Sequence, residues 1–495
     1  MSAPEYDAAV IGLGPVGAVM TGLLALQGLR VLAVERAEEI YDLPRAVHFD
    51  DEAMRVFQTL GIAGEVATVS RANAGMRFVD AEGRLMLDWP RSQVPGPQGW
   101  LPSWRFHQPD LERILRARLA GVQDVEMRLG TECVSLEERD KDVVLSLAGG
   151  GASRAVTARA VLGCDGARSM VRRQIGGVSE DLGFNERWLV VDLLLKRDRP
   201  DLGDFTIQHC NPARPATYVR GPGNRRRWEI TTKPDETDAH LTDPDTVWSH
   251  LARWITPEDA ELERSAVYTF HSTLAGRWRR GRLMIAGDAA HQTPPFLGQG
   301  LCAGIRDASN LAWKLAAWLR GAPDALLETY QTERHRHARS YVDAAVRLGG
   351  LINTSGTEDA LRDGFRQADG SVRMESLLRP LGPGLGTEGD PHRGWLSAQP
   401  RLGEGCLMDD VVGSHWALLQ DGALGPVPLP DGMRSFFSER EPAVARLLKE
   451  LGTAAVLIRP DRYVFGTAQD PAGLRALLLD AATVLGGSVT SSEPA

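Results

Sequence analysis

The chain has 495 residues, which is enough for two or three domains that each bury a core. Its residues are 43% hydrophobic and 24% charged, with a net charge of −9, so the sequence offers no basic surface for nucleic acid or for an anionic membrane. The five cysteines show no Cys-x-x-Cys spacing. We therefore expect neither a disulfide framework nor a metal site, and a reducing, cytoplasmic location.

The N-terminal segment carries a nucleotide-binding pattern. A buried strand is predicted at Tyr6 to Ile11, a helix from Val16 to Leu26, and a second strand from Arg30 to Val34. Between the first strand and the helix lies Gly12-Leu13-Gly14-Pro15-Val16-Gly17, whose glycines allow a tight turn and a close approach to a pyrophosphate. Glu35, at the end of the second strand, is placed to accept hydrogen bonds from a ribose diol. The pattern predicts a bound adenosine diphosphate moiety.

Neither a membrane span nor a signal peptide fits this segment. The stretch from Ala8 to Leu29 has no charge, but Pro15 and several glycines interrupt it and a strand follows at once. A signal peptide is not indicated either, because Glu5 and Asp7 stand where a basic flank is required. We expect no membrane segment here.

The next stretch contains two candidate site residues. Arg45 and His48 lie on the loop after the second strand, from which an arginine can reach a cofactor phosphate or a substrate. The alternative is a solvated arginine and a packed histidine without chemistry. Strands are predicted from Met76 to Trp89, and the Pro-, Gly- and Trp-rich stretch from Trp89 to Trp104 indicates a loop over a pocket.

A helix is predicted from Gln108, with Pro109 at its first turn, and the amide of Gln108 is a candidate cofactor contact. Further along, a strand at Val156 to Leu162 runs into Gly163-Cys164-Asp165-Gly166-Ala167-Arg168. A carboxylate directly after a buried strand can bind a ribose hydroxyl, although this segment alone could also be an ordinary turn.

Residues 178 to 275 have a different pattern and predict an antiparallel sheet inserted into the first domain. The expected elements are strands at Trp188 to Leu195, Phe205 to His209, Ala216 to Val219, Arg227 to Thr232 and Val267 to Phe270, an acidic loop at Asp235 to Asp245, and a helix at Val247 to Ile255.

The nucleotide-binding pattern then resumes. A buried strand at Arg282 to Ala286 precedes Gly287-Asp288-Ala289-Ala290-His291, and a glycine-containing loop at 294–300 precedes a long helix from Leu301 to Leu319. Asp288 can bind another sugar-like hydroxyl, and the helix N-terminus presents free backbone N–H groups that stabilise negative charge.

Together, these three motifs resemble the single-component flavin monooxygenases that hydroxylate phenols, the para-hydroxybenzoate hydroxylase-like family. Residues 294–314 and Tyr268-Thr269-Phe270-His271 look most like 3-(3-hydroxyphenyl)propionate hydroxylases. The resemblance covers roughly residues 5 to 345 and implies FAD as cofactor. The cofactor contacts that it implies are Gly12, Gly14, Pro15, Val16, Gly17, Glu35, Arg36, Arg45, Gln108, Asp165, Gly166, Gly287, Asp288, Pro295, Gly298, Gly300, Leu301 and Cys302.

The reaction that the resemblance implies is the hydroxylation of a small phenolic acid. NAD(P)H reduces the flavin, O2 adds to give a C4a-hydroperoxide, and one oxygen atom passes to the ring. We consider His48, Tyr218 and Tyr268 as phenol partners, with packing or surface roles as the alternative for each. Cys302 stands where relatives often have asparagine, so a backbone contact is expected there.

The last third of the chain resembles the thioredoxin-like tail of some phenol hydroxylases. The predicted order is strand, helix, strand, strand, helix, at Trp416 to Leu419, Glu441 to Leu451, Ala455 to Arg459, Tyr463 to Thr467 and Pro471 to Leu485. The tail lacks a Cys-x-x-Cys pair, so a packing or homodimerisation role is expected instead of redox work.

The sequence thus predicts an α/β fold with a Rossmann-like FAD-binding domain, an inserted antiparallel-sheet substrate domain and a thioredoxin-like C-terminal domain. The expected divisions are 1–75, 105–177 and 278–380 for the first, 76–104 and 178–277 for the second, and 393–495 for the third. Two other functions stay open: oxygenation of a polycyclic polyketide or heteroaromatic compound, and non-catalytic binding of FAD or NAD.

Overall fold

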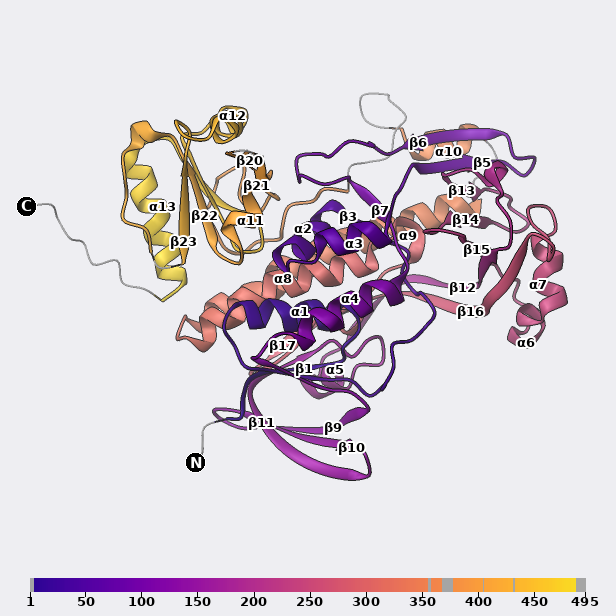
Figure 1. The fold of residues 1–495 in the computed structure, drawn as a ribbon, viewed down its shortest axis with the longest axis horizontal. Helices are drawn as coiled ribbons and strands as arrows, with labels where there is room; N and C mark the ends of the chain where they lie inside the picture. The colour runs from indigo at the N-terminus through magenta and orange to yellow at the C-terminus, as the bar shows by residue number, and fades with distance from the viewer. Residues whose placement is uncertain (1–3, 355–357, 367–376, 404, 431, 487–495) are drawn as a thin grey trace, which may run out of the picture.

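The computed structural model describes residues 4–354, 358–366, 377–403, 405–430 and 432–486. Figure 1 shows a central body built on one sheet, a second sheet beside it that carries α6 and α7, and a C-terminal part with its own sheet on the opposite side. The long helices α8 (Gly300–Leu319) and α9 (Asp324–Thr354) run through the centre between them.

The first sheet has the strand order β17-β18-β11-β1-β2-β8, and β10 and β9 extend it from β11. Its strands are β1 (Tyr6–Ile11), β2 (Val31–Val34), β8 (Val125–Arg128), β9 (Thr131–Glu138), β10 (Val143–Gly149), β11 (Ala152–Gly163), β17 (Arg279–Arg280) and β18 (Leu283–Ile285). The run from β18 to β8 is parallel. The carboxyl ends of these strands therefore meet at one edge, where ligands bind in such sheets.

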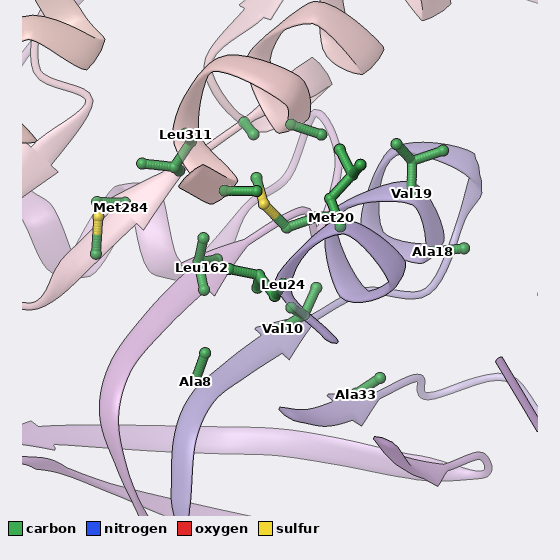
Figure 2. Packing of buried hydrophobic residues seen from close by; sticks show 14 of the residues in the cluster. Ala8, Val10, Ala18, Val19, Met20, Leu24, Ala33, Leu162, Met284 and Leu311 are labelled. Carbon is green, nitrogen blue, oxygen red and sulfur yellow. The ribbon is translucent and has the colours of Figure 1, made fainter. Parts of the chain in front are cut away.

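Apolar packing joins this sheet to α1 (Pro15–Leu26) and α8. The strand β2 is buried along its whole length, as expected for a parallel strand covered on both faces. Figure 2 shows Met20 and Leu24 of α1 in one cluster with Leu162 of β11 and Leu311 of α8. This packing fixes the start of α1 at the carboxyl end of β1.

The second sheet has the order β19-β16-β12-β15-β14-β13-β5-β6. Its strands are β5 (Gly75–Val79), β6 (Leu85–Pro90), β12 (Ser179–Leu195), β13 (Thr206–His209), β14 (Ala216–Arg220), β15 (Arg225–Thr231), β16 (Ala260–Ala275) and β19 (His291–Gln292). β5 pairs in parallel with β13, which brings the early hairpin into the sheet formed by the later segment. Helices α6 (Asp238–Thr242) and α7 (Pro244–Leu251) pack with the apolar core of this sheet.

One local prediction was wrong, and several short strands were missed. The acidic stretch 235–245 contains α6, because the side chain of Thr237 caps its first turn. The Pro-, Gly- and Trp-rich stretch ends in a strand, β7 (Ser103–Arg105), which pairs with β3 (His48–Asp50) and β4 (Arg71–Ala72) in a small sheet. The strand β23 (Met433–Phe437) of the C-terminal part was missed.

The remaining helices of the central body are α2 (Asp51–Thr59), α3 (Ala63–Val69), α4 (Gln108–Ala120), α5 (Met170–Ile175) and α10 (Glu358–Gly364), with short 3-10 turns at Pro200–Leu202, Gly287–Ala289 and Pro295–Leu297. None of the described helices combines the length and apolar character that a membrane crossing requires.

The C-terminal part forms a sheet of order β23-β22-β24-β25 covered by helices. Its elements are β20 (Arg401–Leu402), β21 (Cys406–Leu407), α11 (Met408–Val412), β22 (Trp416–Gln420), a 3-10 turn at Gly422–Leu424, α12 (Pro442–Leu451), β24 (Ala455–Ile458), β25 (Val464–Ala468) and α13 (Pro471–Val484). A buried ion-pair network centred on Glu333 of α9, which binds Arg459 and Lys314, attaches this part to the body. The predicted α/β fold class is confirmed.

Candidate active site

A cleft of about 440 Å³ lies at the carboxyl ends of β1, β2 and β11. Its walls include most residues of the first two sequence motifs, namely Gly12, Gly14, Pro15, Glu35, Arg36, Arg45, Gln108, Asp165 and Gly166. Segments that are far apart in the sequence therefore converge, as the parallel sheet requires.

The glycine turn of this cleft has the shape that a phosphate group needs. Gly12 has a φ of +94°, and a Cβ there would come within 2.5 Å of the carbonyl oxygen of Cys164. A Cβ on Gly14, in contrast, would meet no protein atom within 4 Å, so this glycine faces open space. No side chain caps the N-terminus of α1, which leaves backbone N–H groups available to an anion.

Two carboxylates in the cleft are only partly used by the protein. Glu35 accepts the N–H groups of Leu13 (2.8 Å) and Ala37 (3.0 Å), so it also holds the glycine turn. Asp165 uses Oδ2 to cap α5 through the N–H groups of Met170 and Val171. Its Oδ1 is buried and has no hydrogen-bond partner. A buried carboxylate oxygen without a donor can accept a hydrogen bond from a hydroxyl group of a ligand.

A second cavity, of about 220 Å³, lies between the central body and the second sheet. Predicted residues Arg45, His48, Asp288, Pro295, Gly298, Gly300 and Leu301 line it. Arg45 also lines the first cleft, so the two hollows meet at this residue. One elongated ligand with a nucleotide end and a ring end fits such a pair of hollows, which is the shape of FAD.

Four predicted cofactor residues lie behind the walls. Gly17 packs against Gly12 within the turn, and a Cβ on Gly287 would lie 3.2 Å from the side chain of Val16. The side chain of Val16 therefore packs between the glycine turn and the segment of Gly287. Cys302 is buried, its Sγ lies 3.8 Å from the carbonyl oxygen of Gly298, and burial raises the pKa of its thiol well above the usual range.

Gln108 is bound to the protein instead of being free for a cofactor. Its Oε1 accepts the backbone N–H groups of Arg45 (3.1 Å) and Ala46 (2.8 Å), and its Nε2 donates to Glu112 (2.8 Å). The side chain thereby fixes the loop that carries Arg45. The sequence identified the position but not this partner, because the loop is more than sixty residues away.

The same loop is held from its other side by a buried ionic cluster. Arg227 donates to the carbonyl oxygens of Pro44 (2.5 Å) and Arg45 (3.1 Å), and Arg264 donates to that of Pro44 (2.9 Å). Asp192, on the strand β12 between them, accepts from both guanidinium groups at 2.7 to 3.2 Å. The second sheet thus sets the position of the loop between the two hollows.

His48 lies in the cavity wall with a defined tautomer. Its Nδ1 is 3.1 Å from the carbonyl oxygen of Gly298, which can only accept, so Nδ1 carries the hydrogen. Its Nε2 then accepts the hydroxyl of Ser103 (2.8 Å), whose oxygen receives an N–H of Asn73 (2.8 Å). Burial, followed by the charge of Arg105, lowers the pKa of His48 to about 4, so the ring is neutral near pH 7.

A chain of buried ionic contacts supports the strand of His48 from behind. Arg306 of α8 donates to Asp50 and to Glu52, both at 2.5 Å, and Glu52 also accepts the hydroxyl of Tyr463 at 2.6 Å. Tyr463 belongs to the C-terminal part. That part therefore contributes to the position of the cavity wall.

The structure does not bring the two predicted tyrosines into the cavity. Tyr218 packs on Trp228, with ring centroids 4.9 Å apart, on the opposite face of β14 from the lining residues Thr217 and Val219. Successive side chains of a strand point to opposite faces, which explains the difference. The hydroxyl of Tyr268 accepts from Arg264 (2.9 Å), and its ring stacks on Phe270, which does line the cavity.

The sequence reasoning missed two cavity arginines, Arg91 and Arg105, and the acid Glu229. The two arginines stand near the two ends of the Pro-, Gly- and Trp-rich loop. Their position beside a loop that was predicted to cover a pocket is the signal by which the sequence could have indicated them. Burial lowers the pKa of each arginine to about 10. Burial also raises the pKa of Glu229, which lies 3.7 Å from Arg227.

Comparison with known proteins agrees with this geometry. The profile of the FAD binding domain family matches residues 5–345. A probable NADH-specific resorcinol 4-hydroxylase of Rhodococcus jostii (strain RHA1) is 37% identical over 95% of this chain and 93% of its own length. A 3-(3-hydroxy-phenyl)propionate/3-hydroxycinnamic acid hydroxylase of Burkholderia cenocepacia (strain HI2424) is 39% identical over 94% of both chains.

Among solved structures, the flavin-dependent monooxygenase PieE, in complex with FAD and substrate, superposes with a TM-score of 0.84. It is 22% identical, and the match covers 98% of this chain and all of that one, which supports the shared fold. The predicted FAD cofactor and NAD(P)H reductant are confirmed. The chain therefore belongs to the FAD binding domain family and is an FAD-dependent monooxygenase.

Proposed function

We propose that this enzyme hydroxylates a phenol with a single aromatic ring, using NAD(P)H and O2. The observation that carries the proposal is the junction of the two hollows at Arg45, which places a small cavity next to the end of a nucleotide cleft. In the overall reaction NAD(P)H supplies two electrons, one oxygen atom of O2 enters the ring and the other leaves as water.

The residues of the cleft would hold FAD as follows. Gly12, Gly14 and the N-terminus of α1 would take the pyrophosphate, and Glu35 and the free oxygen of Asp165 would accept ribose hydroxyls. Asp288 and the N-terminus of α8 would contact the ribityl chain and the ring. When bound, FAD supplies hydride acceptance from NAD(P)H and activation of O2.

The relatives favour one ring over a fused polycycle. The resorcinol 4-hydroxylase and the 3-(3-hydroxy-phenyl)propionate/3-hydroxycinnamic acid hydroxylase are named for single-ring phenols and are 37% and 39% identical to this chain. The cavity of about 220 Å³ is shared between the ring end of FAD and the substrate, which favours a small substrate.

We assign the phenol contact to the pair formed by His48 and Ser103. The neutral imidazole keeps Nε2 as an acceptor for the Ser103 hydroxyl, and both residues line the cavity. A phenol hydroxyl that donates to Ser103 while Ser103 donates to His48 is polarised toward the phenolate, which raises the nucleophilicity of the ring. Tyr218 and Tyr268 have no such access.

The strands that make up each of the two large sheets support the division into an FAD-binding domain (1–75, 105–177, 278–380) and a substrate domain (76–104, 178–277).

The C-terminal domain (393–495) has exposed Trp395, Val411 and Leu479, which support a homodimer. Light scattering tests the subunit number. Residues 1–3 and 487–495 lie outside the described part.

The five free cysteines support a reducing, cytoplasmic location.

The experiment is a substrate screen on the purified, FAD-loaded protein. NADH and NADPH oxidation is followed with 3-(3-hydroxyphenyl)propionate, resorcinol and other single-ring phenols, and product mass is measured. We expect faster oxidation and a product heavier by one oxygen atom with at least one of them. A protein that binds FAD but hydroxylates none of these phenols contradicts the proposal.

A further inference from the structure

The cavity contains two arginines that lack a counter-ion. Arg91 forms no ion pair within 4 Å with any residue that the structure describes, and its guanidinium lies over the ring of Trp89 at 3.8 Å. Arg105 donates one N–H to Thr206 (2.5 Å), and its Nε is buried without a partner. Both arginines line the cavity.

Among the residues that the structure describes, no acid near these arginines forms an ion pair with either of them. Burial lowers the pKa of Arg105 and the negative charge of Glu229 raises it, but Glu229 forms its ion pair with Arg227, at 3.7 Å. Burial likewise lowers the pKa of Arg91 and the negative charge of Asp50 raises it, but Asp50 forms its ion pair with Arg306, at 2.5 Å. Asp51, which also acts on Arg91, lies outside the cavity lining. After burial, the charge of Arg91 also lowers the pKa of Arg105, so the two arginines repel each other.

A buried cation without a counter-ion is unfavourable unless a ligand supplies one. An arginine with a free Nε can bind a carboxylate through two parallel N–H groups. Two other polar residues of the lining are engaged with each other, because the hydroxyl of Thr217 donates to Gln208 at 2.7 Å.

We infer that Arg105 and Arg91 bind a carboxylate on the substrate, so that the enzyme selects phenols with a short acidic side chain over neutral resorcinols. This inference rests on the proposed phenol hydroxylation. It assigns the aromatic ring to the space between these arginines and the His48–Ser103 pair. Arg91 directly follows β6 and Arg105 ends β7, so the residues that select the substrate lie at the two ends of one loop.

The test compares one acid with a neutral compound of similar shape. The wild-type holoenzyme is assayed with 3-(3-hydroxyphenyl)propionate, its primary amide, 3-propylphenol and resorcinol, and kcat and KM are measured from hydroxylated product. We expect kcat/KM for the acid to exceed that for the amide and for 3-propylphenol by about 10- to 100-fold, the range of a charge-assisted hydrogen-bonded pair.

Variants then assign the preference to the arginines. Arg105→Met and Arg91→Met should each raise KM for the acid and leave KM for 3-propylphenol nearly unchanged. Arg77→Met is the matched control, because Arg77 lies on β5, the strand paired with β6, but binds Asp88 and is not among the residues that line the cavity. It should keep the wild-type preference.

Wild-type enzyme that hydroxylates 3-propylphenol or resorcinol as efficiently as the acid overturns the inference but leaves phenol hydroxylation intact. Equal losses for acid and neutral substrates in Arg105→Met also overturn it. If neither kind of phenol is hydroxylated, the proposed function itself fails. The wild-type comparison decides the matter even if a variant does not fold.

Discussion

Replacing Asp192 with Asn should release the loop that joins the two hollows. The carboxylate of Asp192 is buried and accepts from Arg227 and Arg264 at 2.7 to 3.2 Å. An amide of the same shape removes the charge and turns an N–H donor toward a guanidinium group. Removing one member of a buried ionic cluster typically costs about 3–5 kcal/mol. We expect the first thermal transition to fall by about 6–20 °C, at about 2–4 °C per kcal/mol for a domain of this size.

The loss should also reach the cofactor, because the two arginines hold the carbonyl oxygens of Pro44 and Arg45. The assay combines differential scanning fluorimetry with the fraction of FAD retained after gel filtration. Asp259→Asn is the control: this buried carboxylate also binds two arginines, but these are Arg197 and Arg199, not the two arginines that hold the loop. If Asp192→Asn keeps its FAD and loses no more stability than the control, the loop is not positioned by this cluster.

Three further outcomes follow from the geometry. Gly14→Ala should leave the melting temperature of the apoprotein unchanged, since the added Cβ meets no protein atom, and should weaken FAD binding at least about tenfold in a fluorescence titration, since that Cβ occupies the space of the ligand. Gly12→Ala should instead destabilise the apoprotein itself, because its Cβ would collide with the backbone of Cys164. Burial lowers the pKa of His48 to about 4, so the unfolded chain binds a proton that the folded chain rejects; this part of the stability is full above pH 6.5 and is lost as the pH falls toward about 4. The urea midpoint of His48→Gln should therefore decrease less over that range than that of the wild type, and an equal decrease would exclude His48 as a contributor. Cys406 is exposed while burial raises the pKa of Cys164 well above its usual range, so the fast phase of thiol labelling should vanish in Cys406→Ser.

The sequence by itself determined the features that depend on local spacing. The glycine turn, the helix that follows it and the carboxylates at strand ends are set by residues close together in the chain, and the order of strands and helices indicates a parallel sheet. Glu35, Asp165 and Asp288 could therefore be placed at one sheet edge before their contacts were known.

Tertiary structure alone decided which side chains reach the cavity. Alternation along β14 puts Tyr218 and Thr217 on opposite faces, but only the packing of α7 on one face shows which of them lines the cavity. The partner of Gln108 and the pairing of β7 with β3, which brings Arg105 next to His48, depend on contacts between distant segments. Such contacts are set by the register of strands and by the burial of whole surfaces, and local spacing does not encode either.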